Sequence, residues 1–210
     1  MARVSQEHLD ARRRQILEGA IRCFARNGFH ATSMQDVLRE SGLSAGAVYR
    51  YFTGKDELIT AIALHVFDRL EEAFTEAARL RPSPLPDEMA GYLAGSVFAG
   101  GDPALPPELA VQAWAETLRD ERLAQVLRGG FERLLGLWTE VVEDYQRRGL
   151  MPGDVPAGHV ARTVLGTMQG FVIQRALFPG ADPAVLADGL RGLTSMTRPD
   201  EPVREEGPEG

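Results

Sequence analysis

The chain has 210 residues, 44% of them hydrophobic and 25% charged, which is the composition of a globular protein with one large domain or two small ones. No apolar run approaches the roughly 18 residues that a membrane-spanning helix needs, so we expect no membrane partner. The net charge is −7, yet residues 1–56 carry nine basic and six acidic side chains, whereas residues 57–210 carry 14 and 24. This asymmetry favours a polyanionic partner at the N-terminal end only, although an uneven solvated surface would show the same counts.

Apolar side chains recur at helical spacing along most of the chain, and no segment shows the strict alternation of a strand. The first clear helix ends at Asn27-Gly28, where glycine can adopt the left-handed conformation that closes a helix. Further helical patterns cover residues 127–145 and 160–172. We therefore predict an all-α fold of about nine helices.

Helix starts and breaks are marked by proline. Asp102-Pro103 and Asp182-Pro183 each combine a capping side chain with proline at the first helical position. The end of the chain from Arg198 is rich in proline, glycine and glutamate without apolar periodicity, so we expect a disordered acidic tail over residues 198–210.

Residues 32–58 contain three helix starts in close succession. Thr32 with Gln35 predicts a capping box, Ser44 predicts a second cap, and Thr53 with Asp56 predicts a third. Gly42 lies where the first two short helices must turn sharply. Two short helices joined by a glycine turn after a longer helix indicate a helix-turn-helix.

The second short helix presents only small side chains at residues 45–47, so its backbone can approach base edges in a major groove. Lys55 is the only lysine of the chain, and it lies at a helix start, where the helix dipole is already positive. A phosphate bound there would remove that conflict. Such corners also occur in proteins that do not bind DNA, and Tyr49 and Tyr51 would then belong to the core.

The stretch T-S-M-Q-D-V-L-R-E-S-G-L-S-A-G-A-V-Y-R-Y-F-T-G-K-D-E-L, residues 32–58, resembles the signature of the tetracycline-repressor (TetR) family of bacterial transcriptional regulators. The Phe24–Phe29 helix end before it also matches that family. The resemblance implies a helix-turn-helix DNA-binding domain over residues 1–54 and a helical ligand-binding and dimerisation domain over residues 55–197. It also implies a homodimer that binds a palindromic double-stranded operator.

The motif match also implies roles for individual residues. Groove-facing positions are Gln35, Ala45, Gly46 and Tyr49. Phosphate-facing positions are Thr32, Ser33, Ser44, Ala47, Tyr51 and Lys55. Arg50 is compatible with either role. Arg3 and the arginines at 12–14 add either non-specific attraction or simply a solvated face.

We expect a ligand pocket where the fourth to eighth helices converge. The candidates are aromatic, methionine and uncharged or acidic polar side chains at helical spacing: Phe67, Phe74, Tyr92, Phe98, Gln112, Trp114, Glu116, Trp138, Met168, Gln169 and Phe171. Plain core packing would give the same pattern. The polar side chains at 112, 116 and 169 favour a cavity, because buried polar groups need partners. The expected effector is a small apolar molecule, with an aromatic or a cationic one left open as alternatives.

The last two helices, about residues 156–177 and 183–196, resemble the pair that forms a four-helix bundle across a dimer axis. Gly166 and Gly170 would allow close helix packing there. Packing within one chain is the alternative.

The chain shows no nucleophile elbow, zinc-protease motif or phosphate-binding loop, so we expect neither an enzyme nor a cofactor. Its four histidines have no metal-ligand spacing, and no metal is expected. Cys23 is the only cysteine, which fits a reducing cytoplasm. The sequence thus predicts a cytoplasmic, ligand-responsive DNA-binding regulator, most simply a repressor. The alternative is a helical protein-interaction module without DNA binding.

Overall fold

The computed structural model describes residues 6–80, 82–98, 105–178 and 180–195. Within these ranges the chain forms nine helices and no strand, which confirms the all-α prediction. The helices are α1 (Gln6–Asn27), α2 (Met34–Ser41), α3 (Ala45–Tyr49), α4 (Lys55–Ala78), α5 (Pro86–Phe98), α6 (Pro107–Glu116), α7 (Glu121–Arg147), α8 (Ala157–Leu177) and α9 (Pro183–Thr194). The expected helix start at Asp102-Pro103 and the expected acidic tail lie outside the described residues.

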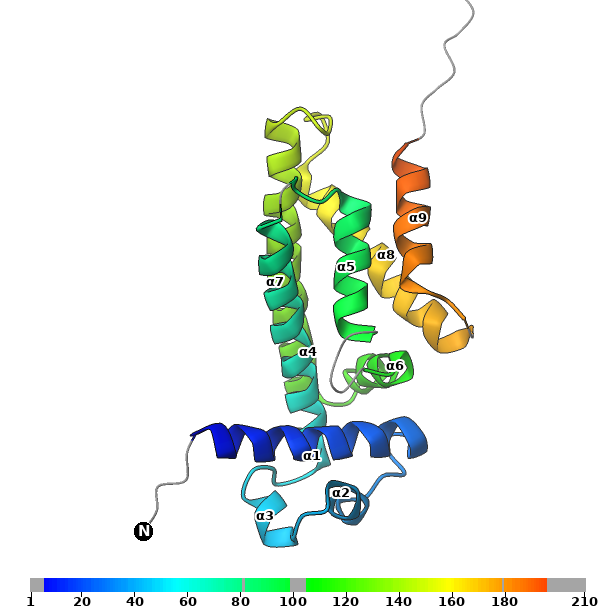
Figure 1. Ribbon diagram of the computed structural model, residues 1–210. Coiled ribbons are helices and arrows are strands. Elements are labelled where there is room, and N and C mark those ends of the chain that lie inside the picture. Colours follow the sequence, from blue (N-terminus) through cyan, green and yellow to red (C-terminus); the bar gives the residue numbers. More distant parts are fainter. Residues whose placement is uncertain (1–5, 81, 99–104, 179, 196–210) are drawn as a thin grey trace, which may run out of the picture.

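Helices α1, α2 and α3 form a head at one end of the molecule, and α1 crosses the lower end of α4 (Figure 1). Ile16, Phe24, Val37 and Val48 are fully buried and hold these helices together. Leu58, from the first turns of α4, is buried in the same cluster. The head is therefore packed directly onto the start of α4, the long helix that leads from the head into the body.

In the body, α4 and α7 run side by side. Helices α5, α8 and α9 lie on one side of this pair, at the right in Figure 1. Helix α5 packs against α9, and α8 packs against α7 and α6. Phe74 and Trp138 meet edge to face with ring centroids 5.2 Å apart, at the centre of a second core cluster. Helix α6 lies between this body and the head and contacts α1.

Helices α4 and α7 approach closely at one glycine. A Cβ atom on Gly130 would lie 2.4 Å from the ring of Phe67. Any larger residue at this position would therefore displace the Phe67 ring.

The turns and two of the caps confirm the sequence predictions. Gly28 and Gly42 have φ of 79° and 67°, the left-handed conformation that closes α1 and α2. The Ser44 hydroxyl accepts from the Ala47 amide at the start of α3, and the Asp182 carboxylate accepts from the Ala184 amide ahead of α9.

Two predicted caps were wrong by one position. Helix α2 is capped by Ser33 with Asp36, not by Thr32 with Gln35, because the Thr32 hydroxyl donates instead to the Cys23 and Gly28 carbonyls of α1. The N-cap of α4 is Gly54, not Thr53. The amide and hydroxyl of Thr53 both donate to Glu57, four residues on, so Asp56 takes no part. The division into two domains stays a prediction, although its boundary coincides with the start of α4.

Candidate functional site

The exposed tip of the head is built from α3 and the residues that flank it. Val48 and Phe52 anchor the short helix in the core, while Ser44, Ala45 and Gly46 are exposed. Tyr49 is 47% exposed, an unusual exposure for so large a ring. One side of α3 is thus free of bulky side chains up to this tyrosine, a shape that allows close approach to base edges.

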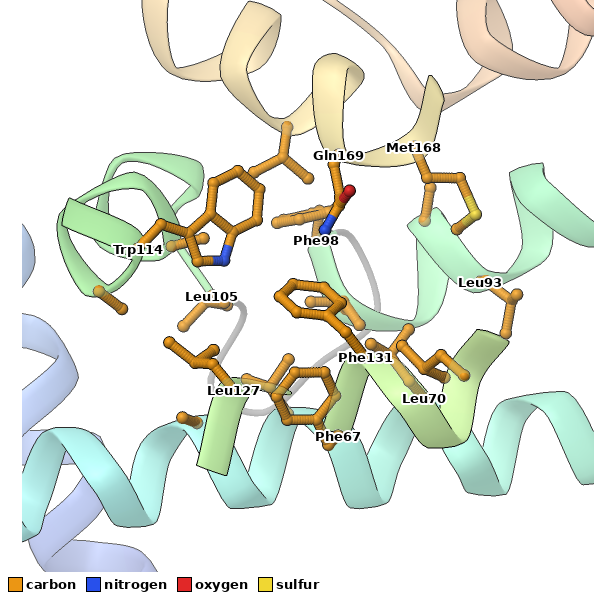
Figure 2. A pocket seen from close by; sticks show the side chains of 18 of the residues that line it. Phe67, Leu70, Leu93, Phe98, Leu105, Trp114, Leu127, Phe131, Met168 and Gln169 are labelled. Carbon is orange, nitrogen blue, oxygen red and sulfur yellow. The ribbon is translucent and has the colours of Figure 1, made fainter. Parts of the chain in front are cut away.

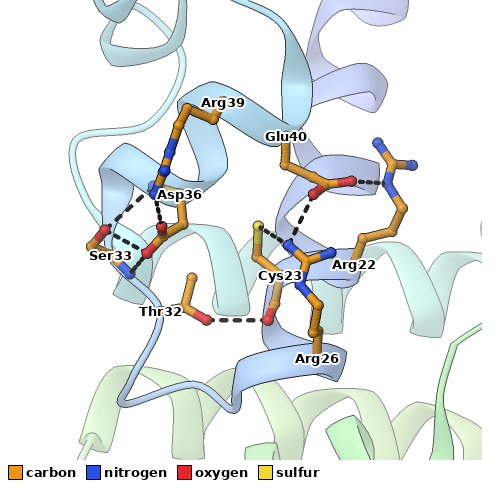
Figure 3. A network of polar contacts seen from close by, with 8 residues as sticks. All are labelled: Arg22, Cys23, Arg26, Thr32, Ser33, Asp36, Arg39 and Glu40. Atoms are coloured by element: carbon orange, nitrogen blue, oxygen red, sulfur yellow. Dashed lines mark hydrogen bonds and ion pairs between the residues drawn. The ribbon is translucent and has the colours of Figure 1, made fainter.

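The start of α2 extends this surface. Ser33 and Gln35 are exposed, and the capping box between Ser33 and Asp36 fixes the start of the helix (Figure 3). The hydroxyl and the amide of Ser33 both donate to the Asp36 carboxylate, and these bonds hold its pKa below the ordinary value. A rigid helix start next to α3 sets the distance between the two candidate contact regions.

Three of the predicted DNA-facing residues are less open. Thr32 is 2% exposed and turns its hydroxyl into the head, so the phosphate-facing role expected for this side chain does not fit its burial. Tyr51 and Ala47 are half-buried. Apart from Lys55, which is half-buried, the remaining candidates are exposed: Ser33, Gln35, Ser44, Ala45, Gly46, Tyr49 and Arg50.

Lys55 has internal partners. Its ammonium donates to the carbonyl oxygens of Phe29, His30 and Thr32 at 3.1, 3.0 and 3.3 Å, and it lies 5.0 Å from the centroid of the Phe29 ring. An ammonium has three N–H groups, so all of them are used. The lysine therefore joins the start of α4 to the segment that follows α1, and no phosphate is needed to explain it. A phosphate contact at Lys55 stays a prediction.

The arginines of the head differ in whether another side chain already holds them. Arg22 and Arg26 both pair with Glu40, at 2.8 and 3.0 Å, and these contacts lower the pKa of that carboxyl (Figure 3). Arg13 lies over the Phe52 ring at 5.5 Å. Arg50, at the end of α3, is exposed and has no ion-pair partner among the described residues. Because it follows Tyr49 on the exposed tip, Arg50 is available to a partner of opposite charge.

The body encloses a cavity of about 120 Å³ between α4, α5, α6, α7 and α8. One water molecule needs roughly 10–15 Å³ of such volume, so the cavity has space for about ten water-sized groups. Every side chain that lines it is uncharged. Three carry polar groups, the Gln169 amide and the indole N–H groups of Trp114 and Trp138, and none of these groups has a hydrogen-bond partner within the described part of the chain. Figure 2 shows Gln169 and Trp114 at the cavity.

The cavity contains most of the predicted pocket residues. Those that line it are Phe67, Phe98, Trp114, Trp138, Met168, Gln169 and Phe171. Phe74 does not: it lies behind Trp138 in the second core cluster. Tyr92 is 42% exposed and bonds Glu76, with the Tyr92 and Glu76 oxygens 2.9 Å apart. Neither of these two predicted residues lines the cavity, because helical spacing does not tell which face of a helix turns inward.

Gln112 and Glu116 were also expected in the pocket but do not line the cavity, and their partners lie in the head. The Phe29 amide donates to Gln112 at 2.9 Å, and His30 lies 3.1 Å from the Glu116 carboxylate. They occupy the face of α6 opposite Trp114, so this one helix touches the cavity on one side and the head on the other.

Sequence reasoning missed Phe131, which lies in the middle of the labelled rings in Figure 2. Its ring meets Phe67 edge to face at 5.2 Å and Trp114 at 6.2 Å. The periodicity of residues 127–145 had placed it on the apolar side of a helix, and its position opposite α6 depends on long-range packing that the pattern does not show.

His65 is half-buried outside the cavity lining, and burial lowers its pKa, with Arg69 adding to the effect. Among the described residues no group of three or more His, Cys, Asp or Glu side chains is arranged to hold a metal ion. No helix in that part of the chain is long and apolar enough to cross a membrane.

Two family models match the chain. The model described as bacterial regulatory proteins, tetR family, matches residues 16–62, and the model of the BetI-type transcriptional repressor C-terminal region matches residues 107–201. The first match covers the head and the start of α4, and the second covers α6 to α9.

Similar proteins agree with both matches. The uncharacterised regulator YfiR of Bacillus subtilis is 30% identical, over 95% of this chain and 98% of that one. The repressor Rv1474c of Mycobacterium tuberculosis is 43% identical over 70 residues, which are 33% of this chain and 37% of that one. The structure of GusR from Salmonella enterica superposes with a TM-score of 0.68 at 30% identity, over 91% of this chain and 98% of that one.

Proposed function

This chain belongs to the TetR family of DNA-binding transcriptional regulators, and we propose that it is a cytoplasmic homodimeric repressor that leaves a palindromic operator when a small apolar effector binds. The family consists of regulators, not enzymes. Its DNA-binding character also speaks against the alternative of an interaction module without DNA binding.

The observation that carries the proposal is the course of α4. Its 24 residues span about 36 Å at 1.5 Å per residue. The first turn is fixed in the head through Lys55 and Leu58, and the middle lines the cavity with Ile62 and Phe67. A rigid element that belongs to both sites allows a ligand in one to change the position of the other.

Helix α6 offers a second connection. Trp114 reaches the cavity, while Gln112 and Glu116 hold the segment after α1. A ligand that displaces Trp114 would therefore pull on the Phe29 amide and on His30. An effector can shift the protein between a DNA-binding and a released arrangement of the head only as far as it binds one of the two arrangements more tightly than the other.

The outer face of α8 and α9 supports the homodimer. Ile173 is 41% exposed, Leu177 66% and Leu193 68%, and burying these apolar side chains against a partner would be favourable. A Cβ atom on Gly166 or Gly170 would meet nothing within 4 Å. We propose that a second copy packs here and forms a four-helix bundle, which would present two α3 helices about one DNA turn, ~34 Å, apart.

On DNA, we propose that Gln35, Ala45, Gly46 and Tyr49 face the groove. Ser33, Ser44 and Arg50 would then contact phosphates on either side, because they flank the α3 face and are exposed.

Light scattering of the purified chain, followed by a titration against fragments of its own genome, tests this function. A dimer that binds a subset of fragments, with an affinity that falls steeply as salt is raised, is expected. A monomer, or a protein that binds no fragment even in dilute buffer, would contradict it.

A further inference from the structure

Arg175 lies beside the cavity, against the Phe98 ring, and one nitrogen of its guanidinium has no hydrogen-bond partner among the described residues. It follows Phe171 and Val172, which line the cavity, by one turn of α8. Its guanidinium carbon lies 5.2 Å from the centroid of the Phe98 ring, another lining residue. The Nη1 nitrogen is fully buried and has no hydrogen-bond acceptor, and no carboxylate pairs with the guanidinium among the described residues.

Arg175 is half-buried as a whole, but its Nη1 nitrogen has left water without gaining an acceptor, and this is unfavourable because the contact with the Phe98 ring supplies no hydrogen bond. No other buried side-chain nitrogen or oxygen in the described part of the chain is in this situation. The fork of an arginine fits a carboxylate especially well, with two parallel charge-assisted hydrogen bonds. What would satisfy Arg175 is therefore an anion that reaches the Phe98 end of the cavity.

The rest of the cavity determines what that anion must be attached to. Apart from the Gln169 amide and the N–H groups of Trp114 and Trp138, its lining is hydrocarbon and aromatic, so the body of the ligand must be largely apolar. Space for about ten water-sized groups suits a hydrocarbon chain of medium length or a single ring system.

We propose, on the basis of the ligand-responsive function proposed above, that the effector is an amphipathic carboxylic acid whose hydrocarbon body fills the cavity and whose carboxylate pairs with Arg175. A neutral alcohol would bond to Gln169 or Trp114 but leave the guanidinium unpaired. A quaternary ammonium would find aromatic rings but no carboxylate in the lining, and it would face a like charge at Arg175.

The chain contains its own reporter of occupancy, because both of its tryptophans, Trp114 and Trp138, line the cavity. The test is a tryptophan-fluorescence titration of the dimeric full chain, below micellar concentration, with octanoate, 1-octanol and octyltrimethylammonium. Octanoate is expected to bind at least about ten-fold more tightly than the other two, the gain that one charge-assisted pair provides.

Arg175→Gln should reduce the octanoate affinity about ten-fold or more and leave that for 1-octanol within a factor of two. Arg162→Gln removes the same charge from an exposed position on the same helix and should change neither. Arg175→Lys retains the charge without the fork and should lie between, which keeps the test valid if the glutamine variant folds poorly. Equal binding of octanoate and 1-octanol, tighter binding of the ammonium, or an unchanged octanoate affinity in Arg175→Gln would overturn the proposal.

A parallel titration of DNA separates this proposal from the function on which it rests. A protein that binds genomic fragments but shows no fluorescence response to octanoate would contradict the acid and leave the regulator intact. A protein that binds octanoate through Arg175 but no DNA would contradict the regulator and support the acid site.

Discussion

Two cations at the tip of the head have different surroundings. Lys55 gives all of its N–H groups to backbone carbonyls of the segment after α1, whereas Arg50 is exposed and unpaired within the described residues. Charge alone would assign both to DNA. Their hydrogen bonds indicate that the lysine holds the head together and that the arginine is free for a phosphate.

Replacing Lys55 by methionine keeps the apolar stem and removes the ammonium. We expect the free energy of unfolding to fall by about 2 kcal/mol, because three backbone carbonyls, two of them in partly buried hydrogen bonds, lose a charged donor. Thermal unfolding followed by circular dichroism measures this. Unchanged stability together with a reduced salt dependence of DNA binding would instead support the phosphate contact.

Arg50→Ala should behave in the opposite way. The side chain is exposed, so stability should stay within about 0.5 kcal/mol. The slope of log affinity against log salt should become shallower by about 0.9, the effect of one phosphate contact, and equally so for all DNA sequences. A changed sequence preference with an unchanged slope would show that Arg50 reads bases.

At the scale of elements, the contact between α4 and α7 depends on Gly130. Gly130→Ala should push the Phe67 ring into the cavity and destabilise the protein by about 1–3 kcal/mol, and it should also weaken ligand binding. Gly129→Ala is the matched control. Its Cβ would meet only Arg133 at an ordinary 3.7 Å, so the higher helix propensity of alanine should stabilise α7 by up to about 1 kcal/mol. Equal effects of the two changes in thermal unfolding would contradict the close contact.

The helices of the head are also fixed by carboxylates. Hydrogen bonds from Ser33, from Arg22 and from Thr53 lower the pKa of Asp36, Glu40 and Glu57 respectively. A carboxyl with a lowered folded-state pKa contributes stability above its unfolded pKa, about 4, and loses it as pH falls through the folded value. Stability should therefore be nearly constant from pH 7 to 5 as far as these groups are concerned, and fall below pH 4.

Substituting Asp36 by asparagine should flatten part of that acid loss, measured as urea unfolding at pH 7 and pH 3. An unaltered pH dependence in this variant would show that the capping carboxylate does not contribute.

His65 acts in the same direction at higher pH: burial lowers its pKa, so protonation below about 6.5 favours the unfolded chain.

For the whole molecule, local patterns predicted the fold well. Helical spacing, Gly28, Gly42 and the Ser44 cap located the head, because these features depend on neighbours in sequence. The cap of α2 was predicted one position early, at Thr32 instead of Ser33, because only packing against α1 decides which of the two adjacent hydroxyls turns inward.

Residues of the cavity could be predicted from the sequence only where the position of a side chain on one helix face was enough to place it. The aromatic positions 67, 98, 114 and 138 lie in the cavity as expected. Gln112 and Glu116 were recognised as polar side chains in need of partners, but their partners at residues 29 and 30 are more than 80 residues away in sequence. No periodicity encodes such a contact, so the link between cavity and head emerged only from the three-dimensional arrangement.

The central claim is that α3 enters the major groove twice, through a symmetric pair of chains. Hydroxyl-radical footprinting of a bound genomic fragment tests it most directly. Two protected half-sites related by two-fold symmetry, with centres about one turn or ~34 Å apart or a multiple of that spacing, are the expected result. A single protected stretch without symmetry, or no protection at all, would contradict it.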